Sequence, residues 1–280
     1  MKKISWNHVS FSLPADWEVT SEGGSTLNGV IVSAPPEGAK LEIYWRKGGR
    51  KKPLKYFDKY IAKLEKRGLK KKSRIKLNVK GHEGYEVVLG DGSKVYVASW
   101  YCDETDRLFI VQMDGEKASQ GLFADIINNI NCHPFSAEKT DWRLMGIGLR
   151  LYKEYFVYER LFKIGFSMAY FLSRDKRVHV IQFSLPKYVA EDTERYKDTR
   201  NRLLKRLLPR MTKLVEMRRD DITINEIRHI LIPRIIYGVL VERILECRKP
   251  DYVQTTLVKA PKKRLEEAIE IANNVYCSEW

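Results

Sequence analysis

Two stretches of the sequence decide how the chain is organised: residues 102–132 are CDETDRLFIVQMDGEKASQGLFADIINNINC, and residues 247–277 are CRKPDYVQTTLVKAPKKRLEEAIEIANNVYC. They align without a gap, and the cysteines at both ends coincide. An Asn-Asn pair and its apolar flanks, at 126–130 and 271–275, also coincide. Agreement of this kind at a long period indicates structural repetition. We therefore predict a tandem duplication of one folded unit.

The front ends of the two halves agree as well, because FSLPADWEV at 11–19 parallels LRLYKEYFV at 149–157. A chain of 280 residues fits two domains of about 140 residues each. A polar stretch at 134–140 separates the halves and indicates the boundary. The predicted domains are 1–135 and 136–280.

Apolar and polar residues alternate in each half, which predicts strands. Short hairpin connections between consecutive strands imply an antiparallel sheet. We therefore expect the α+β class, with two tandem similar domains that each pack an antiparallel sheet with helices. The strands expected in the first half lie around 9–13, 29–33, 41–45, 75–79, 84–89, 94–101 and 107–113.

Helical spacing predicts the remaining elements. Apolar residues recur every three or four positions over 54–67, and Gly68 is suited to end that helix. The second half is expected to contain a longer helix over 189–208 that Pro209 ends, and a closing helix that starts near Pro261.

The order of these elements resembles the PsbP-like fold. The resemblance is carried by Phe11-Ser12-Leu13-Pro14 with Trp17, by Gly81-His82-Glu83-Gly84 at the entry to a meander, and by the middle and closing helices. It covers both halves, more clearly residues 5–132. A photosystem extrinsic subunit, a Ran-binding nuclear import factor and many small bacterial proteins share that fold. The resemblance implies a non-enzymatic binding module, and it transfers no functional residue to this chain.

Positive charge is concentrated in one segment. The chain has a net charge of +15, and residues 46–80 alone hold 16 Lys or Arg against two acids, Asp58 and Glu65, a net +14. Like charges four apart destabilise a helix, so this stripe favours an anionic partner such as nucleic acid, a membrane surface or an acidic protein. Tyr56 and Tyr60 beside it could stack on bases. The anion-binding candidates are Arg50, Lys51, Lys52, Lys55, Lys59, Lys63, Lys66 and Lys70.

A second interpretation of this charge is a solvated lysine face of a thermophile protein, because the chain has only four Gln and is rich in Lys, Arg and Glu.

The four cysteines occupy paired positions. In each half the chain reverses twice between them, which brings both to the same end of the unit, so bridges Cys102–Cys132 and Cys247–Cys277 are candidates. The alternative is four buried thiols. Cys132 is followed by a histidine, but Ser278 replaces that histidine in the second half. We therefore assign no metal ligand and expect no cofactor.

No nucleotide-binding glycine motif, zincin helix or nucleophile elbow occurs, and the five histidines are scattered, so no catalytic residue is assigned. The expected function is a non-catalytic binding protein that contacts nucleic acid or an acidic protein through 46–80. The alternative is an enzyme or small-molecule-binding protein with a site in the cleft between the two halves. No apolar run of 18 residues and no secretory signal occur, so we expect a cytoplasmic protein without a transmembrane segment. The oligomeric state is left open.

Overall fold

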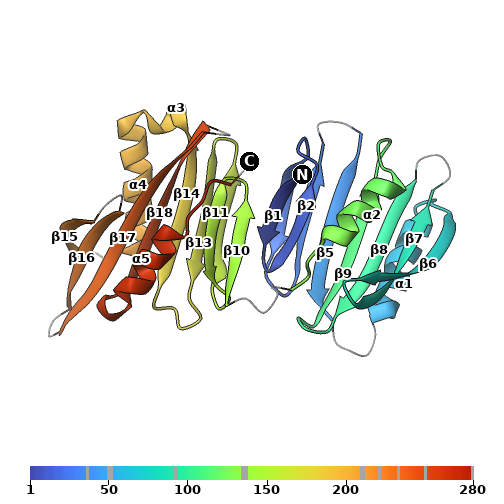
Figure 1. The fold of residues 1–280 in the computed structure, drawn as a ribbon, viewed down its shortest axis with the longest axis horizontal. Coiled ribbons are helices and arrows are strands. Elements are labelled where there is room, and N and C mark those ends of the chain that lie inside the picture. The colour runs from blue at the N-terminus through green and yellow to red at the C-terminus, as the bar shows by residue number, and fades with distance from the viewer. Residues whose placement is uncertain are drawn as a thin grey trace. The chain divides into compact units, whose positions relative to one another are not determined.

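The computed structural model divides the chain into two compact units, Met1–Ser136 and Ala137–Trp280 (Figure 1). None of the helices in the described part of the chain is long and apolar enough to cross a membrane. The structure describes residues 1–35, 38–48, 53–90, 94–133, 138–208, 212–219, 222–231, 234–248 and 251–278.

The first unit begins with a hairpin of β1 (Lys2–Trp6) and β2 (Val9–Leu13). Its two turn residues, Asn7 and His8, both have positive φ, as is typical of tight turns between antiparallel strands. A seven-stranded antiparallel sheet follows, in the order β3-β4-β5-β9-β8-β7-β6. Its strands are β3 (Glu18–Gly24), β4 (Gly29–Ala34), β5 (Lys40–Lys47), β6 (Lys71–Val79), β7 (His82–Leu89), β8 (Val95–Cys102) and β9 (Arg107–Asp114).

Two helices cover opposite faces of this sheet. Helix α1 (Pro53–Glu65) packs in one apolar cluster with Val97 of β8. Helix α2 (Gln120–Asn129) places the ring of Phe123 5.7 Å from that of Tyr96, the neighbouring residue of β8. Because neighbouring residues of a strand point to opposite faces, α1 and α2 lie on opposite sides of the sheet.

The hairpin of the first unit shares the face that α2 covers. Ser10 of β2 forms a bridge with Asn131, two residues after the end of α2. Arg107 of β9 donates hydrogen bonds to the carbonyl oxygens of Asn7 and His8 in the hairpin turn. One covering layer is therefore built from a β-hairpin together with a helix.

The second unit repeats this succession of elements. It starts with a hairpin of β10 (Lys139–Leu144) and β11 (Ile147–Tyr152), and a seven-stranded antiparallel sheet follows in the order β12-β13-β14-β18-β17-β16-β15. Counted from the hairpin, this strand order equals that of the first unit. The strands are β12 (Phe156–Lys163), β13 (Phe166–Leu172), β14 (His179–Pro186), β15 (Thr212–Arg219), β16 (Ile222–Leu231), β17 (Arg234–Arg248) and β18 (Asp251–Pro261).

The helices of the second unit differ from the prediction in detail. The single helix expected over 189–208 is split into α3 (Lys187–Ala190) and α4 (Thr193–Leu207), because the Asp192 side chain caps a new helix by accepting from the N–H of Arg195. Pro209 lies outside the described residues. The closing helix begins late: a 3-10 turn (Lys262–Arg264) precedes α5 (Leu265–Asn273).

The predicted α+β class is wrong, because the protein is mostly β. The described residues form eighteen strands against five α-helices, two of them shorter than ten residues. The prediction assigned the covering layers to helices alone, whereas a hairpin supplies part of a layer in each unit. In the second unit, Gln182 and Gln254 of the sheet donate to the carbonyl oxygens of Gly148 and Gly146 in that hairpin. The first residues of β6, Lys71–Arg74, are all polar and exposed and lack the alternation that identifies a strand, so only 75–79 of this strand was predicted.

Candidate polyanion-binding surface and cysteine sites

The predicted cationic stripe lies on the outer side of α1. The apolar side of the helix is buried against the sheet, and Lys55, Lys59 and Lys63 are exposed on the opposite side. Because a helix rises 1.5 Å per residue, these positions repeat about every 6 Å. Lys66 and Lys70 follow the helix and are exposed too. Three further candidates, Arg50, Lys51 and Lys52, lie outside the described residues.

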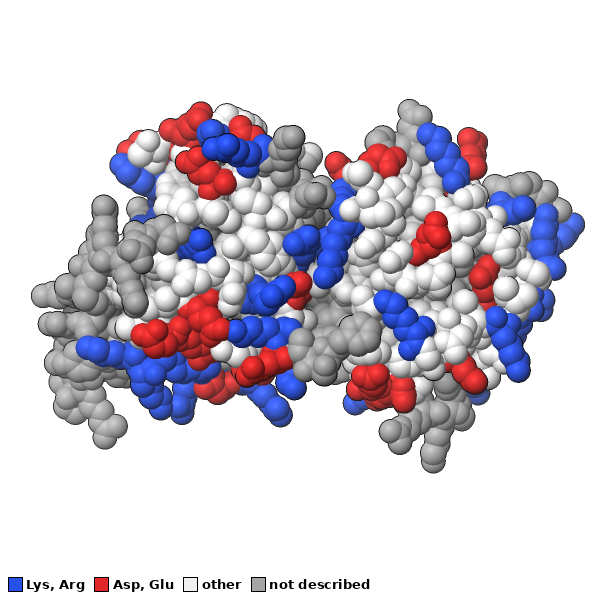
Figure 2. Space-filling view, viewed as in Figure 1, with Lys and Arg blue, Asp and Glu red and all other residues white. Residues whose placement is uncertain are grey.

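Strand β6 adds more lysines beside this helix. It is the last strand in the sheet order, and Lys76 pairs with Tyr85, which packs against the α1 cluster. Residues opposite each other in an antiparallel pair share a face, so Lys76 lies on the α1 side. Figure 2 shows Lys and Arg gathered along the edge of the first unit where Figure 1 draws β6 and α1. We call the following exposed residues the basic surface: Lys55, Lys59, Lys63, Lys66, Lys71, Lys72 and Lys76.

One of the two acidic residues in this segment is already paired. Asp58 of α1 accepts a 2.9 Å hydrogen bond from Arg74 of β6, whose guanidinium lies 4.4 Å from the centre of the Tyr85 ring. Both members of the ion pair are partly exposed, so it contributes at most about 1 kcal/mol to stability. The pair neutralises one acid and joins α1 to the sheet edge.

A groove of about 450 Å³ opens next to the first turn of α1. Lys76 lines it together with the half-buried rings of Tyr85 and Tyr101, and Leu54 and Phe57 of α1 contribute apolar surface. Aromatic rings beside cationic groups are the combination that single-stranded nucleic acid uses for stacking and charge. The groove therefore places stacking partners beside the basic surface, and its lining holds one cation, Lys76, and one acid, Glu83.

The two tyrosines predicted to stack on bases lie in different settings. Tyr60 points inward, since its hydroxyl donates a 2.7 Å hydrogen bond to Gln112 and burial raises its pKa to about 12. Tyr56 is exposed, and the guanidinium of Arg46 lies 4.2 Å from its ring centre. Tyr60 therefore takes no part in the basic surface.

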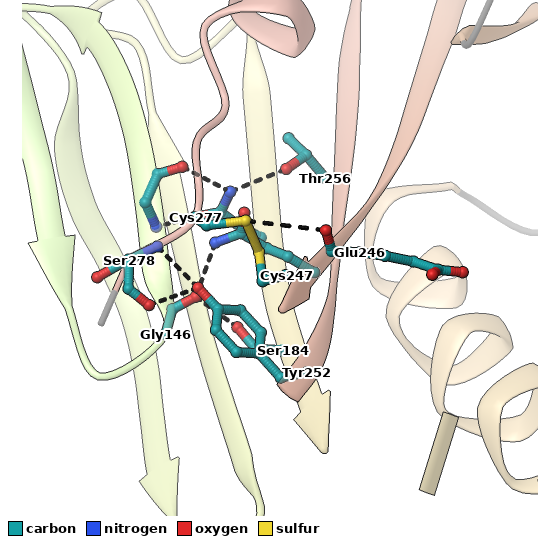
Figure 3. Close-up of a disulfide and its surroundings, with 11 residues drawn as sticks. Gly146, Ser184, Glu246, Cys247, Tyr252, Thr256, Cys277 and Ser278 are labelled. Carbon is teal, nitrogen blue, oxygen red and sulfur yellow. Dashed lines mark hydrogen bonds between the residues drawn. A yellow bond between two sulfur atoms is a disulfide. The ribbon is translucent and has the colours of Figure 1, made fainter. Parts of the chain in front are cut away.

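The predicted bridge between Cys247 and Cys277 is present in the second unit (Figure 3). The Cα atoms are 5.6 Å apart, within the range that disulfides require. It links the end of β17 to the segment that follows α5. Tyr252 secures the same segment, because its hydroxyl donates to the Ser278 carbonyl at 2.5 Å and accepts from the Ser278 N–H at 2.7 Å.

The predicted bridge between Cys102 and Cys132 is wrong, because both are buried free thiols. The Nδ1 atom of His133 lies 3.4 Å from each sulfur, and the hydroxyl of Thr105 donates to the Cys102 sulfur at 3.1 Å. Each sulfur is thus in contact with polar groups, and no disulfide joins the two.

The two thiols have opposite acidities. The pKa of Cys102 falls to about 4, chiefly because the Cys132 thiol donates a hydrogen bond to it, and the Thr105 and His133 contacts act in the same direction. The same interaction and burial raise the pKa of Cys132. A buried guanidinium lies close by: Arg107 is 1 % exposed and donates to the carbonyl oxygen of Cys132.

Two histidines lie beside these thiols, although no sequence pattern predicted the position of His82. One ligand atom from each of His82 and His133, together with the sulfurs of Cys102 and Cys132, lies within 4.8 Å of the other three. One sequence signal was available, the adjacency of Cys132 and His133. It was set aside because Ser278 stands at the corresponding position of the second half.

Comparisons with known proteins add no family. No family model matches the chain, and no curated protein matches it. Two solved structures are similar at a low level. One, described as MucB in complex with MucA(peri), is 12% identical, with 97% of this chain and 88% of that chain covered and a TM-score of 0.20. The other is a bifunctional dehydratase-cyclase domain in ambruticin biosynthesis, 11% identical, with 86% and 98% covered and a TM-score of 0.17. At these TM-scores neither likeness carries an argument, and the PsbP-like resemblance stays a prediction.

Proposed function

We propose that this protein is a non-catalytic binding protein whose first unit contacts single-stranded nucleic acid through the basic surface. The observation that carries the proposal is the row of Lys55, Lys59 and Lys63, exposed along one side of α1 and continued by lysines of the edge strand β6. A cytoplasmic location and an origin of the two units by duplication belong to the same proposal. The duplication is supported by the shared strand order of the two seven-stranded sheets.

The charge arrangement favours an anionic partner for an energetic reason. Like charges at a spacing of four destabilise a helix by roughly 0.2–0.5 kcal/mol per pair, and a bound phosphate chain reverses that sign. From Lys55 to Lys63 the helix axis advances by about 12 Å, a length over which one strand of a duplex presents about four phosphates.

The groove favours a single strand over a duplex. Tyr85 and Tyr101 line the groove beside Lys76, and base stacking on an aromatic ring contributes about 1–3 kcal/mol per base. Bases within a duplex are already stacked on each other, so only an unpaired strand can use these rings.

The test is a binding titration of the full chain with a fluorescent single-stranded RNA at two salt concentrations. Binding is expected to weaken with salt, and the triple variant Lys55→Glu, Lys59→Glu, Lys63→Glu should reduce the slope of log K against log salt by about 2. A matched control changes Lys205, Lys262 and Lys263 of the second unit to Glu. These side chains are also exposed, and the control alters the net charge equally.

Three outcomes would overturn the proposal: no binding at low salt, equal losses in the two triple variants, or tighter binding to an acidic polypeptide than to RNA. The last outcome would point to an acidic protein as the partner.

A further inference from the structure

Four potential metal ligands meet at one end of the first unit. His82 is the first residue of β7, Cys102 is the last residue of β8, and Cys132 and His133 follow α2. All four are buried, with exposures of 8 % or less, and one ligand atom from each lies within 4.8 Å of the others. Residues from three separate parts of the chain therefore converge on one point.

The strand register explains half of this convergence. The pairing of β7 with β8 places Gly84 opposite Trp100. His82 and Cys102 each lie two residues beyond that pair, so they meet across the same end of the ladder and on the same face. The turn that precedes His82 is tight, since Lys80 and Gly81 both have positive φ.

The other half comes from the segment after α2. The bridge between Ser10 and Asn131 fixes the backbone just before Cys132, and Arg107 donates to the carbonyl oxygen of Cys132 itself. His133 then places its Nδ1 atom 3.4 Å from both sulfurs. In a tetrahedral zinc site with Zn–S near 2.3 Å and Zn–N near 2.05 Å, sulfur and nitrogen ligands are about 3.5 Å apart.

His82 contributes a buried nitrogen that needs a partner. Its Nδ1 atom lies 3.2 Å from the Asp103 carboxylate, while its Nε2 atom is buried without a hydrogen-bond partner among the described residues. Leaving a buried polar atom unsatisfied costs about 1–3 kcal/mol. With the proton on Nδ1 facing Asp103, the lone pair of Nε2 is available to a metal ion.

Both histidines have the outer contacts that zinc ligands use. The ring nitrogen of His133 that faces away from the sulfurs, Nε2, lies 3.2 Å from the Glu104 carboxylate, just as His82 faces Asp103. Metal-bound histidines almost always donate their second ring N–H to a carboxylate, carbonyl or water, which fixes the ring and the tautomer. Asp103 and Glu104 fill that role here.

We propose that His82, Cys102, Cys132 and His133 bind one Zn²⁺ ion. Two thiolates and two imidazoles at tetrahedral spacing are a donor set that zinc prefers. All four positions are filled by buried protein atoms, so the site has no open position for a substrate and its role is structural. Binding displaces the thiol protons to solvent, and the two thiolate charges neutralise the charge of the ion.

The first experiment measures metal in the full chain. Protein purified under reducing conditions should contain about one zinc per chain by elemental analysis. After removal of zinc, titration with Co²⁺ should give the d–d bands of a tetrahedral ion and a thiolate-to-cobalt charge-transfer band, which added Zn²⁺ abolishes. A reduced protein that fails to bind Co²⁺, or that shows an octahedral spectrum, would overturn the proposal without recourse to any variant.

Variants then identify the ligands. Cys102→Ser, His133→Ser and His82→Gln should each lose the zinc, whereas the double variant Cys247→Ser, Cys277→Ser should retain it. Circular dichroism shows whether each variant folds. A folded Cys102→Ser protein with full zinc content would contradict the assignment.

The proposed zinc site and the proposed nucleic-acid-binding surface can be tested independently of each other. The triple variant of Lys55, Lys59 and Lys63 should keep its zinc. Loss of RNA binding with zinc retained would therefore support the basic surface and leave the metal site intact.

Discussion

The two units treat the same pair of cysteine positions in different ways. Cys247 and Cys277 of the second unit form a disulfide, whereas Cys102 and Cys132, each 145 residues earlier, remain thiols beside two histidines. The residue after the second cysteine is His133 in the first unit and Ser278 in the second. The unit with a disulfide therefore has a serine after its second cysteine, and the unit with free thiols has a histidine there.

Strand lengths provide a second difference. In the first unit β7 reaches the end of β8, which brings His82 level with Cys102. In the second unit β16 begins at Ile222, opposite Arg243, four residues before Cys247. The described part of β16 therefore provides no counterpart of His82.

In both units, the residue opposite the first cysteine holds the segment after the last helix, through a different side chain in each unit. Arg107 and Tyr252 are also 145 residues apart, and each lies opposite the first cysteine of its unit. Arg107 donates to the carbonyl oxygen of Cys132, and Tyr252 donates to that of Ser278. The comparison teaches that one backbone arrangement can fasten its last segment either through a covalent bond or through four converging ligands.

The largest expected effect comes from removal of the proposed zinc. A chelator with reductant should speed hydrogen exchange in β7, β8 and the segment after α2, while a chelator alone should leave the second unit unchanged. We expect a loss of stability larger than that of a disulfide, because structural zinc supplies about 10–16 kcal/mol to zinc-finger peptides. Hydrogen exchange measured by mass spectrometry reports on each unit separately. Equal exchange in the first unit with and without chelator would contradict the view that zinc holds this unit as the disulfide holds the second.

Removal of the disulfide should have the next largest effect. The double variant Cys247→Ser, Cys277→Ser opens a loop with a sequence separation of 30 and should lower the free energy of unfolding of the second unit by about 3–4 kcal/mol. Denaturant titration at equilibrium measures the loss, and reductant should produce the same shift in the unmodified protein. The first unit is the internal control, since its exchange rates should not change.

Loss of the Tyr252 hydroxyl should cost less. Tyr252→Phe leaves the buried N–H and carbonyl of Ser278 without their partner, which should destabilise the second unit by about 1–3 kcal/mol. Tyr276→Phe is a matched control. The hydroxyl of Tyr276 lies 3.3 and 3.4 Å from two carbonyl oxygens, so the hydrogen bonds that it donates to them are long and its removal should cost under about 1 kcal/mol. Similar losses in both variants would show that the Tyr252 contacts are not special.

The smallest expected signal, a difference of two reactive thiols per chain, should come from converting one kind of link into the other. His133→Ser removes the imidazole that lies against both sulfurs, and under oxidising conditions Cys102 and Cys132 should then form a bridge. Intact-mass measurement after alkylation should show two fewer reactive thiols than in the unmodified protein. Persistence of both thiols would mean that the backbone, rather than His133, keeps the sulfurs apart.

Local elements of the first unit were predictable because their signals are local. All seven strands expected there are present as β2 and β4 to β9, and the helix expected over 54–67 is α1. β1 and β3 were missed, and in the second unit one predicted helix proved to be two. The predicted α+β fold class was wrong because it depended on tertiary packing: no sequence pattern showed that hairpins would cover part of each sheet.

The candidate sites also separate into features with a local sequence signal and features that depend on tertiary contacts. The position of the basic surface followed from the charge count and helical spacing, and the pairing of Cys247 with Cys277 followed from the count of chain reversals. The same count of chain reversals wrongly predicted a bridge between Cys102 and Cys132, because it shows only that two cysteines lie at the same end of a unit and not that they bond. The prediction that Tyr60 could stack on bases failed for a similar reason, because helical spacing does not show that its hydroxyl reaches Gln112.

The sequence by itself determined where most strands of the first unit and its helix α1 form, where the positive charge accumulates, and that the cysteines of each half lie at one end of it. Only the tertiary structure decided which of those cysteines bond to each other and that His82 joins Cys102. The physical reason is that spacing along the chain sets the periodicity of an element, whereas contact between His82, Cys102 and Cys132 depends on strand register and on two residues of positive φ. Those features place atoms to within an ångström, and no periodic pattern encodes them.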